Sequence, residues 1–326
     1  MLRVGFSAQK AFRFHRFRGI ITAYSEMEEA VMPSFVTHWY FAAQVRDAAP
    51  PAIAQPCTSA ADAFFWGSQG PDPFFFDLSH PKTAGLGGEM HRNAIYPVFS
   101  AMAATAGRSP AALAYLLGFC THYALDRTTH PYIESQSRRL MASYGLGESA
   151  AHKLCEADLD AAVLLRCGKP PATCAAYRFL NPETPAQGEI ARMLAAAGRA
   201  AGGSVLPRDA LRAMRGMYAA YRLIHEGRGA TGILSAGERL MRNPGAVSSM
   251  IRRGSLLPED SLNTARRVWL SRSGRPRTDS FEMLMEGDAL ALAGQLQRAA
   301  CAAVRRGKTL PEDLFPLDYS GRELAK

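Results

Sequence analysis

The chain has 326 residues, 48% of them hydrophobic, and a formal net charge of +9. This length allows one large domain or two and is sufficient to bury a sizeable core. A run of about 18 apolar residues does not occur, which excludes a transmembrane helix, and the N-terminus lacks the apolar core of a signal peptide. We therefore expect a cytoplasmic protein, whose only membrane association would be peripheral.

Helix-forming composition dominates the chain. Alanine-rich segments recur along it, whereas the β-branched alternation typical of strands is scarce. The composition predicts an all-α fold, and we find neither an internal repeat nor a break that would mark a second domain. We expect a single domain of packed helices over 32–306, preceded by a loosely ordered extension over 1–31 and followed by a C-terminal tail over 307–326.

The basic residues are concentrated in one region. Residues 208–277 contain fourteen arginines, no lysine and five acidic residues, an excess that equals the net charge of the whole chain. Arginine at this density is typical of phosphate or carboxylate recognition or of an anionic membrane surface. An ordinary solvated helical face is an equally good interpretation.

The first predicted elements are short and are separated by proline and glycine. Ser34 is a suitable cap for a helix over 35–47 that carries His38, and a second helix is expected over 59–65. The following Gly- and Pro-rich segment predicts a tight irregular loop with Asp72 at its tip.

Two longer helices should follow. One runs to residue 106 and contains His91, and the next spans 111–129 and ends near Pro131. Another is expected over 147–166. Beyond it we expect helices near 184–201, 207–225, 228–242 and 278–306, with a long connection over 243–278.

Two of these helices carry regularly spaced ligand-type side chains. An α-helix repeats about every 3.6 residues, so residues four apart lie on one face. This spacing places His122, Asp126 and His130 on one face of the first helix. It places His152 and Glu156 on one face of the second helix. Imidazole nitrogen with carboxylate oxygen suits zinc, and more than four such donors indicate more than one ion.

The pattern of motifs resembles the zinc-dependent phospholipase C family, which is related in fold to fungal single-strand-specific nucleases. The matching pieces are Thr37-His38, Trp66-Gly-Ser-Gln-Gly-Pro-Asp72, Gly-Glu-Met-His91, Gly-Phe-Cys-Thr-His122-Tyr-Ala-Leu-Asp126 and His152-x-x-x-Glu156. The resemblance implies two or three zinc ions in a cleft lined by helices. By position, His38 would bind one ion, Asp72, His91, His122 and Asp126 a second, and His130, His152 and Glu156 the third, with Asp126 able to bridge to the ion of His38.

The chain departs from the family pattern at two points, and one of the ligand assignments has a competitor. In the secreted members the amino group of the mature N-terminal tryptophan completes one zinc shell, whereas here the equivalent position follows a 31-residue lead. That site is expected to be weaker, completed by water, or empty. The spacing from Asp126 to His130 is also shorter than in those members. His80 competes with His91 as the ligand after Asp72, and we prefer His91 because a glycine-flanked helix start positions it better.

The resemblance implies a phosphodiester hydrolase in which zinc-bound hydroxide attacks phosphorus. Asp72 is expected to orient or deprotonate the attacking water. The favoured substrate is a phospholipid cleaved on the glycerol side of the phosphate. The alternatives are a nuclease or small phosphodiesterase that uses 208–277 to bind a backbone, and a non-catalytic protein with structural metals or a membrane-binding role. The aromatic residues at 39, 66 and 74–76 could line an acyl cleft, stack on bases or simply form core.

Overall fold

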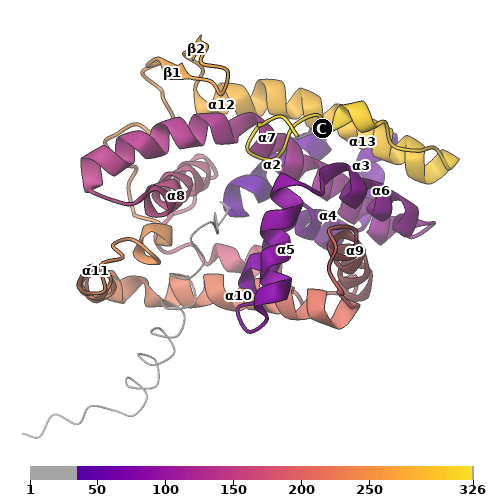
Figure 1. The fold of residues 1–326 in the computed structure, drawn as a ribbon, viewed down its shortest axis with the longest axis horizontal. Coiled ribbons are helices and arrows are strands. Elements are labelled where there is room, and N and C mark those ends of the chain that lie inside the picture. Colours follow the sequence, from indigo (N-terminus) through magenta and orange to yellow (C-terminus); the bar gives the residue numbers. More distant parts are fainter. Residues whose placement is uncertain (1–34, 325–326) are drawn as a thin grey trace, which may run out of the picture.

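A computed structural model describes residues 35–324, which form packed helices with almost no sheet (Figure 1). The predicted all-α class is confirmed. The α-helices are α2 (Phe35–Ala48), α3 (Pro51–Ser59), α4 (Ala61–Gly67), α5 (Pro81–Arg92), α6 (Ile95–Ala106), α7 (Pro110–Tyr144), α8 (Glu148–Arg166), α9 (Gln187–Ala200), α10 (Pro207–Gly227), α11 (Thr231–Leu240), α12 (Phe281–Leu284) and α13 (Leu290–Arg306).

Shorter elements connect these helices. They are the 3-10 helices η1 (Asp72–Phe76), η2 (Ala176–Leu180), η3 (Arg228–Ala230), η4 (Ser248–Met250) and η6 (Glu312–Leu314), and the π-helical turn η5 (Met285–Ala289). Strands β1 (Trp269–Leu270) and β2 (Pro276–Arg277) pair antiparallel, with Trp269 opposite Arg277. Among residues 35–324, no helix combines the length and apolarity that a membrane span requires.

Helix α7 is the central element of the molecule. Helices α2, α3, α4, α8 and α13 all pack against it. In Figure 1, α12 and α13 run along the upper side of the molecule and α10 along the lower side, with α7 between them. Because α7 is covered on most of its circumference, its side chains are buried over several consecutive turns.

Two glycines let α4 approach α7 very closely. A Cβ atom on Gly118 would lie 2.0 Å from the carbonyl oxygen of Phe64, and one on Gly67 would lie 2.1 Å from that of Tyr115. Only glycine permits such backbone contact. The contact brings the segment after α4, which contains Asp72, against the middle of α7.

The predicted end of the long helix near Pro131 is wrong, because α7 continues to Tyr144 and ends at Gly145 in the left-handed conformation. Proline removes one backbone hydrogen bond. Burial of Tyr132, Ile133 and Leu140 on the following turns favours continuation of the helix. Tertiary packing therefore outweighs the local preference.

Other boundaries differ from the predictions in the first third of the chain. Helix α3 was not predicted. It begins at Pro51, and proline is well suited to a first helical turn. The single helix expected up to residue 106 is divided at residues 93–94. The segment expected to be irregular contains the 3-10 helix Asp72–Phe76. The connection over 243–278 is largely irregular, as predicted.

Of the two predicted terminal segments, the structure describes only the C-terminal one, up to residue 324. The predicted extension over 1–31 lies outside the described residues. The segment predicted to be a tail packs against the helices, and Phe315 and Tyr319 are buried in the core. Residues after 306 therefore contribute to the folded domain.

Candidate metal centre

The donors expected from the sequence come together in one buried cluster. Helix α2 supplies His38, η1 supplies Asp72, and α5 supplies His91, while α7 and α8 supply the remaining donors. Three sets of three residues have ligand atoms within 4.8 Å of one another. These sets are His38, His122 and Asp126; Asp72, His91 and His122; and His130, His152 and Glu156.

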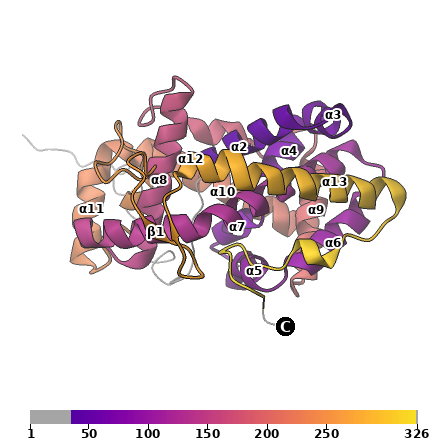
Figure 2. The same cartoon turned by 90° about the horizontal axis from the view of Figure 1, so that it is seen from above.

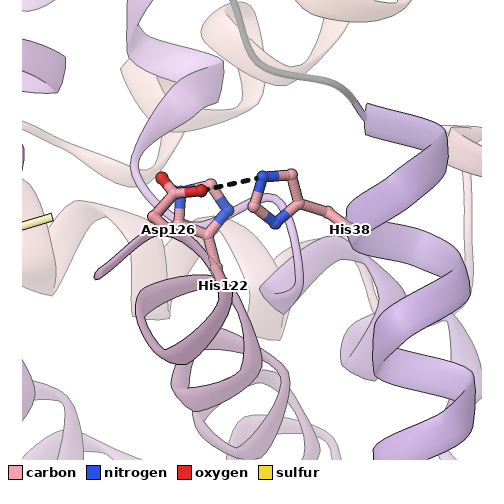
Figure 3. A group of neighbouring side chains, drawn as sticks. All are labelled: His38, His122 and Asp126. Carbon is pink, nitrogen blue, oxygen red and sulfur yellow. Dashed lines mark ion pairs between the residues drawn. The ribbon is translucent and has the colours of Figure 1, made fainter. Parts of the chain in front are cut away.

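The first set joins α2 to α7 (Figure 3). His38 Nε2 lies 3.1 Å from Asp126 Oδ1. The imidazole rings of His38 and His122 stack with centroids 4.2 Å apart. The carboxylate of Asp126 thus faces the ring of His38 across the interface between the two helices.

Asp126 also faces the second set. Its Oδ2 atom lies 3.2 Å from His122 Nε2 and 3.8 Å from His91 Nε2. The same His91 Nε2 atom lies 3.3 Å from Asp72 Oδ1. The two oxygens of Asp126 therefore point toward different sets, which is the geometry required of a bridging carboxylate.

The third set lies between α7 and α8. Glu156 Oε1 is 3.1 Å from His152 Nε2 and 3.9 Å from His130 Nε2. Asp126 Oδ1 lies 3.9 Å from His130 Nε2, which links this set to the other two. All the sets therefore belong to one continuous centre.

Backbone carbonyl groups orient three of the imidazoles. The Nδ1 atoms of His91, His122 and His130 lie 2.7, 3.1 and 3.0 Å from the carbonyl oxygens of Gly87, Ser68 and Tyr319, respectively. A proton on Nδ1 satisfies each carbonyl and leaves Nε2 unprotonated. Metal-binding histidines are commonly oriented in this way. All three Nε2 atoms face the carboxylates of the cluster.

Several buried polar atoms of the cluster lack hydrogen-bond partners. They include both carboxylate oxygens of Asp72, Oε2 of Glu156 and Nδ1 of His38. Buried polar atoms are normally satisfied, because leaving them unpaired is energetically costly. A cation bound among the carboxylates would remove this cost for the oxygens. The donor set therefore fits zinc.

The pKa values reflect the crowding of these groups. Burial alone would raise the pKa of Asp126, but His130, His122 and His38 in their protonated forms outweigh burial and lower it well below its usual range when no metal ion is bound. Burial raises the pKa of Glu156 well above its usual range and lowers that of His152 to about 4. His152 is thus neutral at pH 7, as a metal ligand must be, and a cation bound beside Glu156 would favour the ionised form of its carboxyl group.

Asp160 fixes the position of α2 and was not predicted from the sequence. Its Oδ1 atom accepts hydrogen bonds from the backbone N–H of Thr37 at 2.8 Å and from the Thr37 hydroxyl at 2.9 Å. The carboxylate caps the first turn, which places His38. Asp160 is four residues after Glu156, so the spacing that identified the ligands of α8 could have revealed it.

Gly70 brings the loop backbone against His122. Its φ is +54°, and a Cβ atom there would lie 2.3 Å from Cδ2 of His122. The preceding Ser68 carbonyl accepts the Nδ1 proton of the same ring. The loop therefore needs glycine at this point to enclose His122.

Tyr319 completes the centre from the C-terminal segment. Its backbone N–H donates to the carbonyl of His91 at 3.1 Å, and its ring lies 4.6 Å from that of His91. Its carbonyl accepts from His130. This role could not be predicted from the sequence, because the contacts are made mainly by the backbone, and His130 and Tyr319 are 189 positions apart.

The alternative ligand His80 lies outside the three sets. Its Nδ1 is 3.0 Å from Asp77 Oδ1, and 49% of its side chain is exposed. His91 has only 15% of its side chain exposed and contacts Asp72. The geometry therefore places His91 beside Asp72, but the reason given for preferring it was wrong, because His91 lies in the last turn of α5 and not at a helix start.

The aromatic residues beside Asp72 belong mainly to the core. Residues 74–76 and Trp66 are buried, and Trp66 Nε1 donates to the carbonyl of Asn181. Trp39 is half-buried and stacks on Phe65 and Phe179. Of the three interpretations offered by the sequence, packing accounts for these rings.

Comparison with known proteins gives one match. A family model described as zinc dependent phospholipase C matches residues 37–192. Searches of curated proteins and of solved structures gave no significant match. The matched region contains every donor of the three sets.

Proposed function

A family model for zinc-dependent phospholipase C matches residues 37–192, and from this premise we propose that the protein is a zinc-dependent phosphodiester hydrolase acting on phospholipids. One observation carries the proposal. Three neighbouring sets of donors, with buried carboxylate oxygens left unpaired, lie inside the family region. Structural stabilisation alone would not require so many ionisable groups in one place.

We assign two or three zinc ions to the three sets. His38 would hold one ion with one oxygen of Asp126, and His130, His152 and Glu156 would hold another. Asp72, His91 and His122 would bind a further ion, and the second oxygen of Asp126 would be available to it. Zinc in such a centre polarises phosphate oxygens and lowers the pKa of bound water toward 7.

The side chains of the protein have separate roles in the reaction. The carboxylate of Asp72, held on a buried 3-10 turn, orients the attacking water and accepts its proton. The carbonyl groups of Gly87, Ser68 and Tyr319 keep the imidazoles in fixed directions. Fixed ligands preorganise the centre for the charge that develops on the phosphate.

The expected substrate is a phospholipid, cleaved between glycerol and phosphate. The products are diacylglycerol and a phosphorylated head group. The family match supports this substrate class. Hydrolysis is tested by incubating the zinc-loaded protein with phospholipid in mixed micelles and identifying both products, with single-stranded oligonucleotides as a parallel substrate.

His122→Ala should abolish hydrolysis, because this imidazole belongs to two of the three sets. His80→Ala provides the matched control, since His80 lies outside them and should retain full activity. Equal activity in both variants, or cleavage of oligonucleotides without cleavage of lipid, would contradict the proposal.

A further inference from the structure

A cavity lined by arginine lies beside α11, and none of the donors of the metal centre is among its lining residues. Its volume is about 710 Å³, and its walls come from α8, α11 and the segment 244–254. Arg228, Arg239, Arg252 and Arg253 line it, and no acidic residue does. Four guanidinium groups around one cavity favour an anionic ligand, and their planar donor pattern suits phosphate.

These arginines have few internal partners. Arg252 lies 3.8 Å from Asp160 and donates to backbone carbonyls. Arg228 donates to the carbonyl of His225, and Arg253 lies over the ring of Tyr144. Within the described part of the chain, no carboxylate forms an ion pair with Arg228, Arg239 or Arg253. Their charge is therefore available to an external anion.

The acidic residue of α11, Glu238, is not among the residues that line the cavity. Glu238 is fully buried and accepts hydrogen bonds from the backbone N–H groups of Gly245, Val247 and Ser248 at 3.0, 2.7 and 2.9 Å. Its carboxylate is thus used to fix the loop that forms one wall. The cavity is preformed, and its electrostatic character is set by arginine.

The outer surface of α11 is apolar. Ile233 and Leu240 are 70% and 87% exposed. At about 100° per residue these side chains share one side of the helix, whereas Thr231, Ser235 and Arg239 share the side that lines the cavity. Helix α11 lies at one end of the long axis in both views (Figures 1 and 2). Helix α11 therefore carries exposed apolar side chains on one side and borders the arginine-lined cavity on the other.

We propose that α11 docks the protein on an anionic phospholipid bilayer. Ile233 and Leu240 enter the boundary between head groups and acyl chains, and the arginine-lined cavity receives head-group phosphates. An anionic bilayer is complementary to this surface, because it offers negatively charged phosphate groups next to an apolar layer. The inference extends the proposed function to a membrane partner, but it does not involve the metal centre.

The test is sedimentation of the full-length protein with vesicles. We expect binding to vesicles that contain phosphatidylglycerol and much weaker binding to pure phosphatidylcholine, with affinity falling as salt rises. Arg239→Gln should lower the affinity for anionic vesicles about fivefold, and Leu240→Ser by about tenfold. Both residues are exposed, so the fold should tolerate the changes.

Arg208→Gln and Leu206→Ser are matched controls. They remove the same charge and the same side chain from exposed positions at the start of α10. That position is about 30 Å from α11, the length of a 21-residue helix. Both controls should bind vesicles like the natural protein. Equal losses in control and test variants would overturn the proposal.

Two further outcomes are decisive. If Leu240→Ser dissociates a dimer and leaves vesicle binding unchanged, a second copy covers this surface and the proposal fails. Hydrolysis of a soluble short-chain phospholipid is measured in parallel. Loss of vesicle binding with retained hydrolysis is expected for Leu240→Ser. Vesicle binding by a zinc-loaded protein that hydrolyses nothing would contradict the proposed function alone.

Discussion

Asp126 illustrates how one residue unites the metal centre. Its Oδ1 atom faces His38 and its Oδ2 atom faces His122 and His91. The imidazoles lower its pKa despite complete burial, so it is ionised across the physiological range. A carboxylate that remains charged inside the core is suited to bridge two cations.

Gly70→Ala should damage the centre without removing a ligand. The new methyl group would collide with the His122 ring and displace its Nε2 atom. We expect hydrolysis to fall at least about tenfold, because small misplacements at an active centre are costly. Gly274→Ala is the control: its φ is also positive, at +74°, but nothing lies within 4 Å. Activity that is equal in the two variants would refute this role of Gly70.

Lys153 is predicted to destabilise the protein at neutral pH. Burial lowers its pKa from 10.5 to about 8, so the unfolded chain binds this proton more strongly than the folded one. The free energy of unfolding should therefore rise with pH between about 8 and 10.5, and at pH 7 the lysine costs about 3 kcal/mol.

Lys153→Met removes this cost together with one hydrogen bond to the carbonyl of Ala246. We expect a net gain of about 2 kcal/mol at pH 7, which should disappear by about pH 10.5. Urea denaturation at both pH values measures the difference. A variant less stable than the natural protein at pH 7 would show that the buried ammonium group is stabilising.

At the scale of elements, the helical repeat explains what the sequence could predict. Donors four residues apart on α7 and α8 must share a face, whatever the rest of the fold does. The capping of α2 by Asp160 and the contact of Tyr319 with His130 join positions 123 and 189 residues apart. Such contacts depend on tertiary packing, as does the continuation of α7 through Pro131.

Asp160→Asn should loosen the first turn of α2 and so displace His38. The amide keeps one acceptor but loses the negative charge that favours the helix N-terminus, at a cost of about 1 kcal/mol. We expect weaker binding of one zinc ion, measured by competition with a chromogenic chelator.

Asp158→Asn is the matched control for this effect. Asp158 lies on the same helix and accepts a hydrogen bond from the backbone N–H of Leu257 at 2.9 Å, away from the donors. It should lower stability to a similar extent and leave zinc affinity unchanged. Equal zinc affinities in the two variants would mean that Asp160 does not position the centre.

At the scale of the whole molecule, both ends of the described chain meet at the metal centre. Helix α2 contributes His38, and the C-terminal segment contributes the backbone of Tyr319. Removing residues 307–326 should therefore reduce zinc retention on dialysis. Tyr319→Phe keeps the ring and the backbone contacts and should retain zinc fully. Undiminished zinc in the truncated protein would show that the segment is dispensable.

The central claim is that the clustered donors form a multinuclear zinc centre. Elemental analysis of the purified full-length protein, after dialysis against metal-free buffer, measures zinc per chain directly. We predict two or three ions per chain, with a decrease in His122→Ala and none in His80→Ala. A natural protein that takes up no zinc, even when refolded with excess zinc, would contradict the account.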